Sequence, residues 1–387
     1  MKITKINHKT VPIASKIKNA FIDFSSMTIS IVAVHTDYKI CGKAVIGLGF
    51  NSNGRYGQEG ILKERIIPRL LSAGEYEISN KETGIIDPFK CWEIMMTNEK
   101  PGGHGERSVA VGTIDMALWD IVAKVENVPL YKLLGERYNS GEYLSRVYTY
   151  AAGGYYYPGE NIQKLQEELK KYLDMGFNAC KIKVGGATLK EDIARIEASI
   201  KVLGDGKKLA VDANGRFNQE QAIEFLMSIE QYKLKWYEEP VDPLDYQVAS
   251  MVASASKTPL ATGENIFSLI DSKNLVLYGG LMPNRDYLQM DPVLSYGLVE
   301  YFRILEMLKI HNWKNDRCIP HGGHQFGLHV AAGLGLYGNE SYPEVFFPFG
   351  KFANGMKIEN SLVSLIDTPG IGYEEVPEIY EIMKPLL

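Results

Sequence analysis

From about residue 145 onward, strand-like and helix-like stretches alternate at a regular interval, and this alternation most constrains the fold. Several of the helix-like stretches begin with a capping pattern: Thr188 is followed three positions later by Glu191, and Asn218 by Gln221. Between these helices lie short runs of apolar and β-branched residues that end in polar ones. The eight candidate strands are RVYTYAAGG, ACKIKV, KLAVDAN, LKWYEEP, PLATGEN, YLQMDP, CIPHGG and LGLYGNE.

Several successive strand ends lie about 26 to 30 residues apart, which is the length of one strand, one helix and two short loops. Eight such units favour a (β/α)8 barrel over an open doubly wound sheet. No GxGxxG loop follows any candidate strand, which weakens the dinucleotide-binding alternative. We therefore predict an α/β protein in which residues 141–341 form a (β/α)8 TIM-type barrel.

The first 140 residues follow a different pattern, and a chain of 387 residues is long enough for a second domain. The runs MTISIVAVHT and KAVIGLGF predict a β-hairpin with Asp37 and Gly42 in its turn. A long helix after residue 105 has one apolar face, formed by Ala110, Ile114, Ala117, Leu118 and Ile121. We predict an α+β capping domain over residues 1–140, and we expect the weakly periodic segment 342–387 to return to it.

A polar, glycine-containing loop at residues 51–58 separates the predicted hairpin from the helices that follow. It is either a linker or a lid over a functional site, and the sequence leaves both interpretations open.

Composition excludes several classes of protein. A net charge of −5 gives no sign of a surface for polyanions, so we expect no nucleic-acid partner. No apolar run approaches the ~20 residues that span a membrane, and the N-terminus lacks the apolar stretch of a secretion signal, so we expect a cytoplasmic protein without a membrane partner. The cysteines are far apart and form no CxxC pair, which argues against disulfides and zinc.

Three acids stand at the ends of consecutive candidate strands. Asp212, Glu238 and Glu264 are separated by 26 residues each. In a barrel, each would project into the same mouth, and carboxylates that converge without cysteine or histidine suit a hard cation such as Mg²⁺, or Mn²⁺. Isolated strand-end acids are often helix caps or salt-bridge partners instead, but their regular spacing favours the metal site.

The alternation of side chains along a strand predicts which of them face the barrel interior. Lys181 and Lys183 share a face, and a barrel strand exposes lysines to solvent only at its mouth, so both are candidate functional residues. Asp291 also points inward in its strand. For WYEEP the same analysis is ambiguous, because either Glu238 or Glu239 could be the inward acid.

His321 follows Asp291 by 30 residues, one further repeat unit. A carboxylate at one strand end could then orient the imidazole at the next and raise its basicity, whereas His324 and His329 fit better on the following helix. Lysines on one side of a metal and an Asp–His pair on the other suit abstraction of the proton next to a carboxylate, with a metal-stabilised enediolate. We expect the second lysine and the metal to depress the pKa of Lys183 so that it can act as a base.

The combination of KIK, DAN, EEP, GEN, LQMD and PHGGH strongly resembles the enolase superfamily, in its mandelate racemase-like branch. The resemblance extends over nearly the whole chain and selects Glu238 over Glu239. It implies the following roles: metal ligands Asp212, Glu238 and Glu264; acid/base residue Lys183, supported by Lys181; catalytic dyad Asp291 and His321; and Glu340 as the acid that binds the substrate carboxylate.

Within that branch, the segments NSNGRYGQ, NEKPGGHGERS, WYEEPVDPLDY, PHGGHQFGLH and NESYPEVFFPFG are similar to those of enzymes that dehydrate D-tartrate. This resemblance implies a Mg²⁺-dependent dehydratase of a small hydroxy diacid, in which Lys183 removes the α-proton and His321 assists the loss of hydroxide. Lys100 would reach the second carboxylate, and Asn51 and Tyr56 would contact the substrate. We also expect a homo-oligomer.

Three alternatives remain open at this point. The same residues could dehydrate another sugar acid, or could act as a racemase or epimerase that returns a proton to the same carbon. A barrel retained only for binding is a third alternative, but the intact set of lysines, acids and histidine argues against it.

Overall fold

The computed structural model describes residues 1–13, 15, 17–157, 159 and 161–387. Its larger part is a barrel in which strands β4 to β9 are parallel and each pairs with the next. The barrel closes because β10 pairs in parallel with β4. These strands span β4 Arg146–Gly153, β5 Cys180–Lys183, β6 Leu209–Asp212, β7 Trp236–Glu238, β8 Leu260–Thr262, β9 Tyr287–Leu288 and β10 Asn339–Ser341.

Between β9 and β10 the barrel wall is completed by residues 318–320. The amide of Ile319 donates to the carbonyl oxygen of Leu288 at 2.8 Å, and the amide of Tyr337 donates to that of Cys318 at 3.1 Å. The prediction of a regular strand at CIPHGG was wrong, because this segment forms only an isolated bridge at Cys318. Pro320 has no amide hydrogen to donate, and Gly322 follows with a φ of +104°, so the ladder cannot continue.

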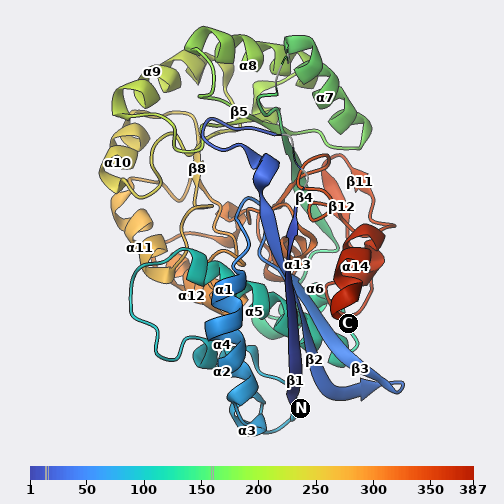
Figure 1. Cartoon of the computed structure of the whole chain (residues 1–387). Coiled ribbons are helices and arrows are strands. Elements are labelled where there is room, and N and C mark those ends of the chain that lie inside the picture. The colour runs from blue at the N-terminus through green and yellow to red at the C-terminus, as the bar shows by residue number, and fades with distance from the viewer. Residues whose placement is uncertain (14, 16, 158, 160) are drawn as a thin grey trace.

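The eighth predicted strand, LGLYGNE, begins later than expected. The preceding helix extends to Leu334, and Gly335 ends it with a φ of +62°, so that only Asn339–Ser341 is extended. The remaining barrel strands lie where the sequence predicts them. The (β/α)8 architecture is therefore confirmed, with helices on the outside of the sheet (Figure 1).

Among the described residues, seven helices connect the barrel strands; in Figure 1, α7 to α9 arc over the top of the molecule and α10 and α11 continue down its left side. The capping boxes at Thr188 and Asn218 are both present, with the threonine and asparagine side chains accepting from the amides of Glu191 and Gln221. These helices are α7 Ile162–Asp174, α8 Leu189–Leu203, α9 Gln219–Ile229, α10 Tyr246–Ala255, α11 Leu269–Tyr278, α12 Leu298–Ile310 and α13 Gln325–Leu334.

The N-terminal part is a three-stranded antiparallel sheet, β1 to β3, backed by helices. Cys41 and Gly42 form the turn of the predicted hairpin, both with positive φ, as a two-residue turn requires. Asp37 is not in the turn; it lies within β2, at a register shift between His35 and Lys39. The elements are β1 Ile3–Pro12, β2 Thr28–Ile40, β3 Lys43–Phe50, α1 Glu59–Ile61, α2 Ile67–Ser72, α3 Glu75–Ile78, α4 Pro88–Met95, α5 Glu106–Val125 and α6 Leu130–Tyr138.

Helix α5 joins the cap to the barrel and is buried on all sides rather than on one face, from Ser108 to Ala123. Glycines allow this close packing. A Cβ on Gly49 of β3 would lie 2.4 Å from the carbonyl oxygen of Thr113, and one on Gly112 would lie 1.8 Å from that of Val293. The cap sheet and the loop after β9 therefore both contact the backbone of α5 directly.

The C-terminal segment contacts both parts of the chain. Strand β12 Leu362–Ser364 pairs with β11 Ile358–Glu359 and, antiparallel, with β4. Beyond α14 Pro377–Met383, the carbonyl oxygen of Leu386 accepts a hydrogen bond from Nδ2 of Asn7 at 2.5 Å. The predicted division into 1–140, 141–341 and 342–387 stays a prediction.

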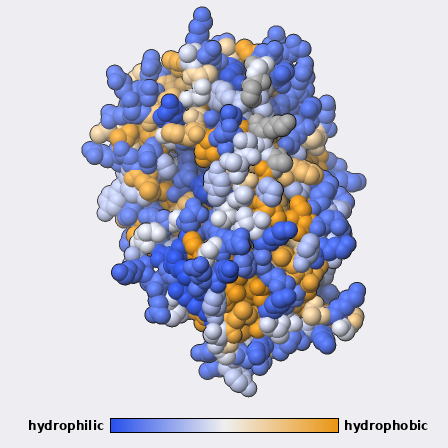
Figure 2. Space-filling model, viewed as in Figure 1, coloured by the Kyte–Doolittle hydropathy of each residue, from blue (hydrophilic) through white to orange (hydrophobic). Residues whose placement is uncertain are grey.

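On the face shown in Figure 2, apolar surface gathers over the strands of the cap sheet and polar surface covers much of the rest. Within the described part of the chain, no helix has both the length and the apolar character needed to cross a membrane.

Candidate active site

Lys181 and Lys183 lie in the barrel interior on β5, and both side chains are almost fully buried. Nζ of Lys183 donates to Oδ2 of Asp212 at 2.5 Å. Nζ of Lys181 pairs with Glu238 and lies 2.8 Å from Oε1 of Glu340. Every charge on these lysines is thus matched by a carboxylate, as buried ammonium groups require.

The pKa of Lys183 is raised, not depressed, by the groups of the protein. Burial lowers this pKa most, and Lys181 lowers it further as expected, but Asp212, Tyr155 and Glu264 together outweigh both. Lys181 thus acts in the direction that the sequence predicts, and the expected effect of a metal ion on this pKa stays a prediction. For Lys183 to be neutral, another cation must balance the negative charge of the Asp212 carboxylate.

Asp212, Glu238 and Glu264 converge as the spacing predicts. One carboxylate oxygen from each lies within 4.8 Å of the others, and all three residues are buried. The parallel register places Asp212 beside both Lys183 and Glu238 on neighbouring strands.

Glu238, rather than Glu239, points into the barrel. Its Oε2 accepts hydrogen bonds from Nε1 of Trp236 at 2.8 Å and from Nε2 of Gln289 at 2.9 Å. Glu239 has a φ of +37° and turns away, so that both of its oxygens accept from Nδ2 of Asn265. The ambiguity that strand alternation leaves in WYEEP is resolved by this change in backbone direction.

The donor set fits a divalent metal ion. Burial raises the pKa of Glu238 to about 8; Lys181 opposes this shift, and the neighbouring carboxylates add to it. Converging buried carboxylates repel one another, and an added cation relieves that repulsion. Oxygen ligands without sulfur or nitrogen suit Mg²⁺ or Mn²⁺.

Asp291 and His321 form the predicted pair. Oδ2 of Asp291 lies 3.2 Å from Nδ1 of His321, and Oγ of Ser52 donates to the same oxygen at 2.6 Å. Burial lowers the pKa of His321, but Glu264, Asp291 and Glu340 together raise it above its usual value. His324 instead caps α13, where its side chain accepts from the amide of Gly327.

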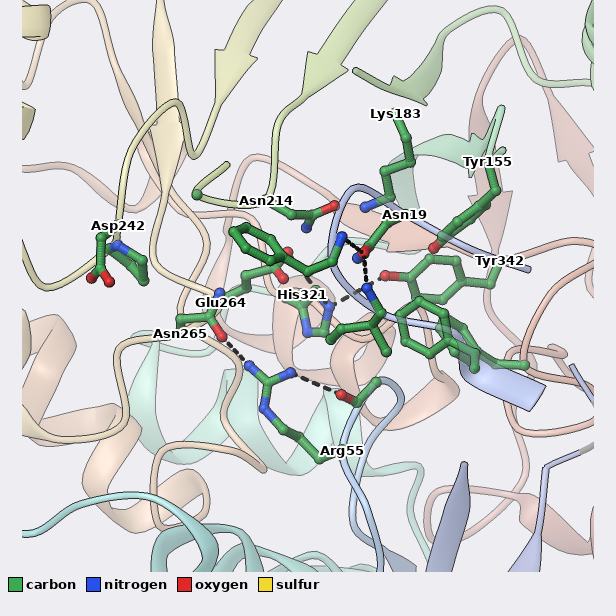
Figure 3. A pocket seen from close by; sticks show the side chains of 17 residues that line it. Asn19, Arg55, Tyr155, Lys183, Asn214, Asp242, Glu264, Asn265, His321 and Tyr342 are labelled. Atoms are coloured by element: carbon green, nitrogen blue, oxygen red, sulfur yellow. Dashed lines mark hydrogen bonds and ion pairs between the residues drawn. The ribbon is translucent and has the colours of Figure 1, made fainter. Parts of the chain in front are cut away.

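A cavity of about 270 Å³ is lined by three of these residues, Lys183, Glu264 and His321. In Figure 3, Lys183 enters it from one side and His321 from another, with Glu264 beside His321. The polar residues that line it include Arg55, Asn214, Lys183, Glu264, Asn265 and His321.

Three of the predicted substrate-binding residues do not line this cavity. Lys100 is exposed on the loop after α4. Asn51 is fully buried, and its side chain is used within the protein: Oδ1 accepts from the amide of Ser30, and Nδ2 donates to the carbonyl oxygens of Arg55 and Tyr56. Tyr56 is 47% exposed, and its hydroxyl lies 3.2 Å from Oγ of Ser26.

Glu340, the fourth, does not line the cavity either, but it contacts residues that do. It is fully buried, and its Oε2 accepts from the hydroxyl of Tyr342 at 2.9 Å and from the amide of Gly322 at 3.2 Å. The structure thus brings Glu340 together with Lys181 and the His321 loop.

The sequence reasoning missed Tyr342 and Arg55. Tyr342 follows Glu340 by two positions, so strand alternation could have placed both on one face. Arg55 lies within the loop at residues 51–58, and nothing in the sequence of that loop distinguishes Arg55 from a solvated surface cation. Nothing in the sequence pattern marks the other cap residues that line the cavity, which are Asn19, Phe21, Ile22 and Phe24.

Comparison with known proteins places the chain among characterised relatives. Residues 164–379 match the family "Enolase C-terminal domain-like", and residues 3–135 match "Mandelate racemase / muconate lactonizing enzyme, N-terminal domain". The chain is 30% identical over 293 residues to arabinonate dehydratase of Saccharolobus solfataricus, covering 72% of this chain and 74% of that protein. It is 29% identical over 332 residues to L-talarate/galactarate dehydratase of Salmonella typhimurium, covering 84% and 76%.

The crystal structure of that Salmonella typhimurium dehydratase, liganded with Mg and L-lyxarohydroxamate, superposes with a TM-score of 0.77 at 25% identity. The match covers 95% of this chain and 88% of the other.

Proposed function

Because this chain belongs to the enolase superfamily, in the branch of mandelate racemase and muconate lactonizing enzyme, we propose that it is a Mg²⁺-dependent dehydratase of a small hydroxy acid. The observation that carries this proposal is that Lys183 and His321 face the same cavity, with the acid cluster beside them (Figure 3). Two acid/base groups around one carboxylate site are what the removal of a proton and a hydroxyl from neighbouring carbons requires.

Asp212, Glu238 and Glu264 would hold the metal ion. When bound, Mg²⁺ supplies positive charge that satisfies Asp212 in place of Lys183 and that stabilises negative charge on the substrate carboxylate. Lys181 remains paired with Glu238 and Glu340, so it supports the site rather than exchanging protons.

Lys183 then takes the proton from the carbon next to the carboxylate, and the electron pair of that C–H bond forms a C=C bond. The C–O bond to the β-hydroxyl breaks as His321 donates its Nε2 proton, so that water leaves. Asp291 holds Nδ1 and thereby orients Nε2 toward the cavity. The resulting enol tautomerises to a keto acid, which for D-tartrate is oxaloacetate.

D-tartrate is the substrate that we propose. Two observations support a compact diacid: the sequence segments described above, and a cavity that is small beside the ~300–1,000 Å³ of typical sites for drug-sized ligands. The related dehydratases named above act on longer sugar acids, so another acid of that class is the nearest competitor.

Racemisation or epimerisation by the same two groups is the second candidate, because Lys183 and His321 approach the cavity from different sides. A racemase returns a proton to the carbon that lost one, and it forms no keto acid.

The test is to incubate the purified protein and Mg²⁺ with each tartrate stereoisomer and with a panel of mono- and dicarboxylic sugar acids, and to record keto-acid formation. We expect keto acid from D-tartrate in preference to the others. No keto acid from D-tartrate, with turnover of a monocarboxylic sugar acid, would exclude the proposed substrate but leave the reaction class. Inversion of a stereocentre without keto acid would instead identify a racemase.

We further propose, from the sequence alone, that the protein works as a homo-oligomer in the cytoplasm. Light scattering of the purified chain tests the first part of this proposal.

A further inference from the structure

Arg55 is a cation in the candidate catalytic cavity, and no carboxylate in the described part of the chain forms an ion pair with it. It lines the cavity together with Lys183, Glu264 and His321. Its Nη1 donates to the carbonyl oxygen of Gly54 at 2.8 Å, and its Nη2 donates to Oδ1 of Asn265. Across residues 1–13, 15, 17–157, 159 and 161–387, no ion pair joins Arg55 to an acid.

Arg55 is held in place, which distinguishes it from a solvated surface arginine. Nδ2 of Asn51 donates to the carbonyl oxygens of residues 55 and 56, and Nδ2 of Asn53 donates to that of Gly322 at 2.6 Å. The guanidinium carbon lies 5.3 Å from the ring centroid of Phe267. The loop 51–58 is thereby tied to the loop that carries His321, and the guanidinium has a fixed position relative to it.

The guanidinium retains unused donors. An arginine has five N–H groups, and the two hydrogen bonds described above leave the others available to a ligand. Figure 3 shows this group below His321 and Glu264, directed toward Asn265 at the cavity edge. A planar fork of donors matches a carboxylate in two-point geometry, which a lysine ammonium does not.

We infer that Arg55 binds the second carboxylate of the substrate and so selects dicarboxylic over monocarboxylic hydroxy acids. This inference deepens the proposed function and rests on it: the first carboxylate is taken at the acid cluster, and the remote end of the substrate reaches Arg55. A monocarboxylic acid of the same length offers a neutral hydroxymethyl group there, and the half-buried guanidinium is left without an anionic partner. Arg55 therefore takes the role that the resemblance implies for Lys100, which is exposed and does not line the cavity.

The test compares a diacid with its monoacid analogue in wild-type protein, Arg55→Met and Arg55→Lys. The pair is D-tartrate and threonate of matching configuration, which differ only in the carboxylate replaced by hydroxymethyl. We expect Arg55→Met to lower kcat/KM for D-tartrate roughly 10- to 100-fold and to change that for threonate by less than about threefold. Arg55→Lys should restore part of the loss.

Calorimetric dissociation constants, measured with Mg²⁺ present, provide a second readout that needs no turnover. The wild type should bind D-tartrate more tightly than threonate, and Arg55→Met should abolish that preference. Arg146→Met, which removes a surface arginine paired with Glu359, is the matched control and should retain the preference for D-tartrate over threonate.

The outcomes separate the two hypotheses. A wild type that binds D-tartrate with an Arg55-dependent preference but forms no keto acid from it overturns the proposed reaction and supports the role of Arg55. Equal loss of affinity for both ligands in Arg55→Met overturns the role of Arg55, and so does a preference lost in Lys100→Met but kept in Arg55→Met.

Discussion

The hydroxyl oxygen of Tyr342 lies 3.2 Å from Nε2 of His321. Its single hydrogen is donated to Oε2 of Glu340 at 2.9 Å, so it faces the imidazole as an acceptor. On the other side of the ring, Nδ1 faces the carboxylate of Asp291, another acceptor. Both ring nitrogens of His321 therefore find acceptors, which is the environment of a protonated imidazole and the state that an acid toward a leaving hydroxyl needs.

Removal of the Tyr342 hydroxyl group should slow the loss of the β-hydroxyl and leave the abstraction of the α-proton unchanged. We expect Tyr342→Phe to lower the rate of keto-acid formation about 3- to 10-fold, because one hydrogen bond that orients His321 is lost. Exchange of the α-proton with solvent depends on Lys183 and should be unchanged. Measurement of both rates in D₂O distinguishes this from a general structural defect, which would lower both.

Rates of α-proton exchange and of keto-acid formation should also distinguish the roles of Lys183 and His321. Lys183→Ala should lose α-proton exchange and dehydration together, each by about 10²- to 10⁴-fold, because no other group in this proposal removes the proton. His321→Asn should lose dehydration but retain exchange. Exchange that persists in Lys183→Ala would show that Lys183 is not the base.

The barrel and the main site residues could be predicted because their signals are periodic. The acids at 212, 238 and 264 repeat with the strand–helix unit, and Asp291 and His321 continue it. The seventh strand could not be predicted correctly, because apolar and β-branched residues in CIPHGG resemble a strand until Pro320 and the glycines after it interrupt the ladder.

The residues that approach the cavity from the cap could not be predicted in the same way. Arg55, Asn19, Phe21 and Ile22 lie outside regular helices and strands, where no periodicity relates sequence position to side-chain direction. The resemblance implies that Asn51 contacts the substrate, whereas its side chain forms hydrogen bonds with the backbone of its own loop and of Ser30. Such contacts depend on how the cap docks on the barrel, which α5 and its glycines determine.

Metal binding should stabilise the fold, because the carboxylates of Asp212, Glu238 and Glu264 are buried together. At a Mg²⁺ concentration of about 100 times Kd, linkage predicts about 2.7 kcal/mol of added stability, and chelation should lower Tm by a few degrees. Differential scanning calorimetry with Mg²⁺ or a chelator measures this. Glu264→Gln should lose most of the difference in Tm between Mg²⁺ and chelator. Glu359→Gln, which changes an exposed acid far along the chain, should retain that difference.

The contact of α5 with the barrel loop should be intolerant of a single methyl group. A Cβ at Gly112 would lie 1.8 Å from the carbonyl oxygen of Val293, a backbone atom that cannot rotate away. We expect Gly112→Ala to reduce the free energy of unfolding by about 1–3 kcal/mol or more. Gly60→Ala, where a Cβ meets nothing within 4 Å, is the matched control and should be neutral or slightly stabilising. Chemical denaturation of both variants tests this, and equal stability would contradict it.

Glu99 should make the stability of the cap depend on acid pH. Burial raises the pKa of its carboxyl group, but hydrogen bonds from Arg65, Arg69 and Arg107 outweigh burial and lower that pKa to about 2, from about 4.5. Because the pKa is lower in the folded state, the stabilisation is fully present above about pH 4.5 and is lost as the pH falls toward 2. Wild type should therefore be more stable than Glu99→Gln at neutral pH, and urea denaturation at a series of pH values should show the difference shrinking below pH 4.5.

Glu93→Gln removes an exposed partner of Arg303 and should change stability by less than about 1 kcal/mol at every pH. A difference for Glu99→Gln that stays constant from pH 7 to the acid limit would contradict the assignment of this charge cluster.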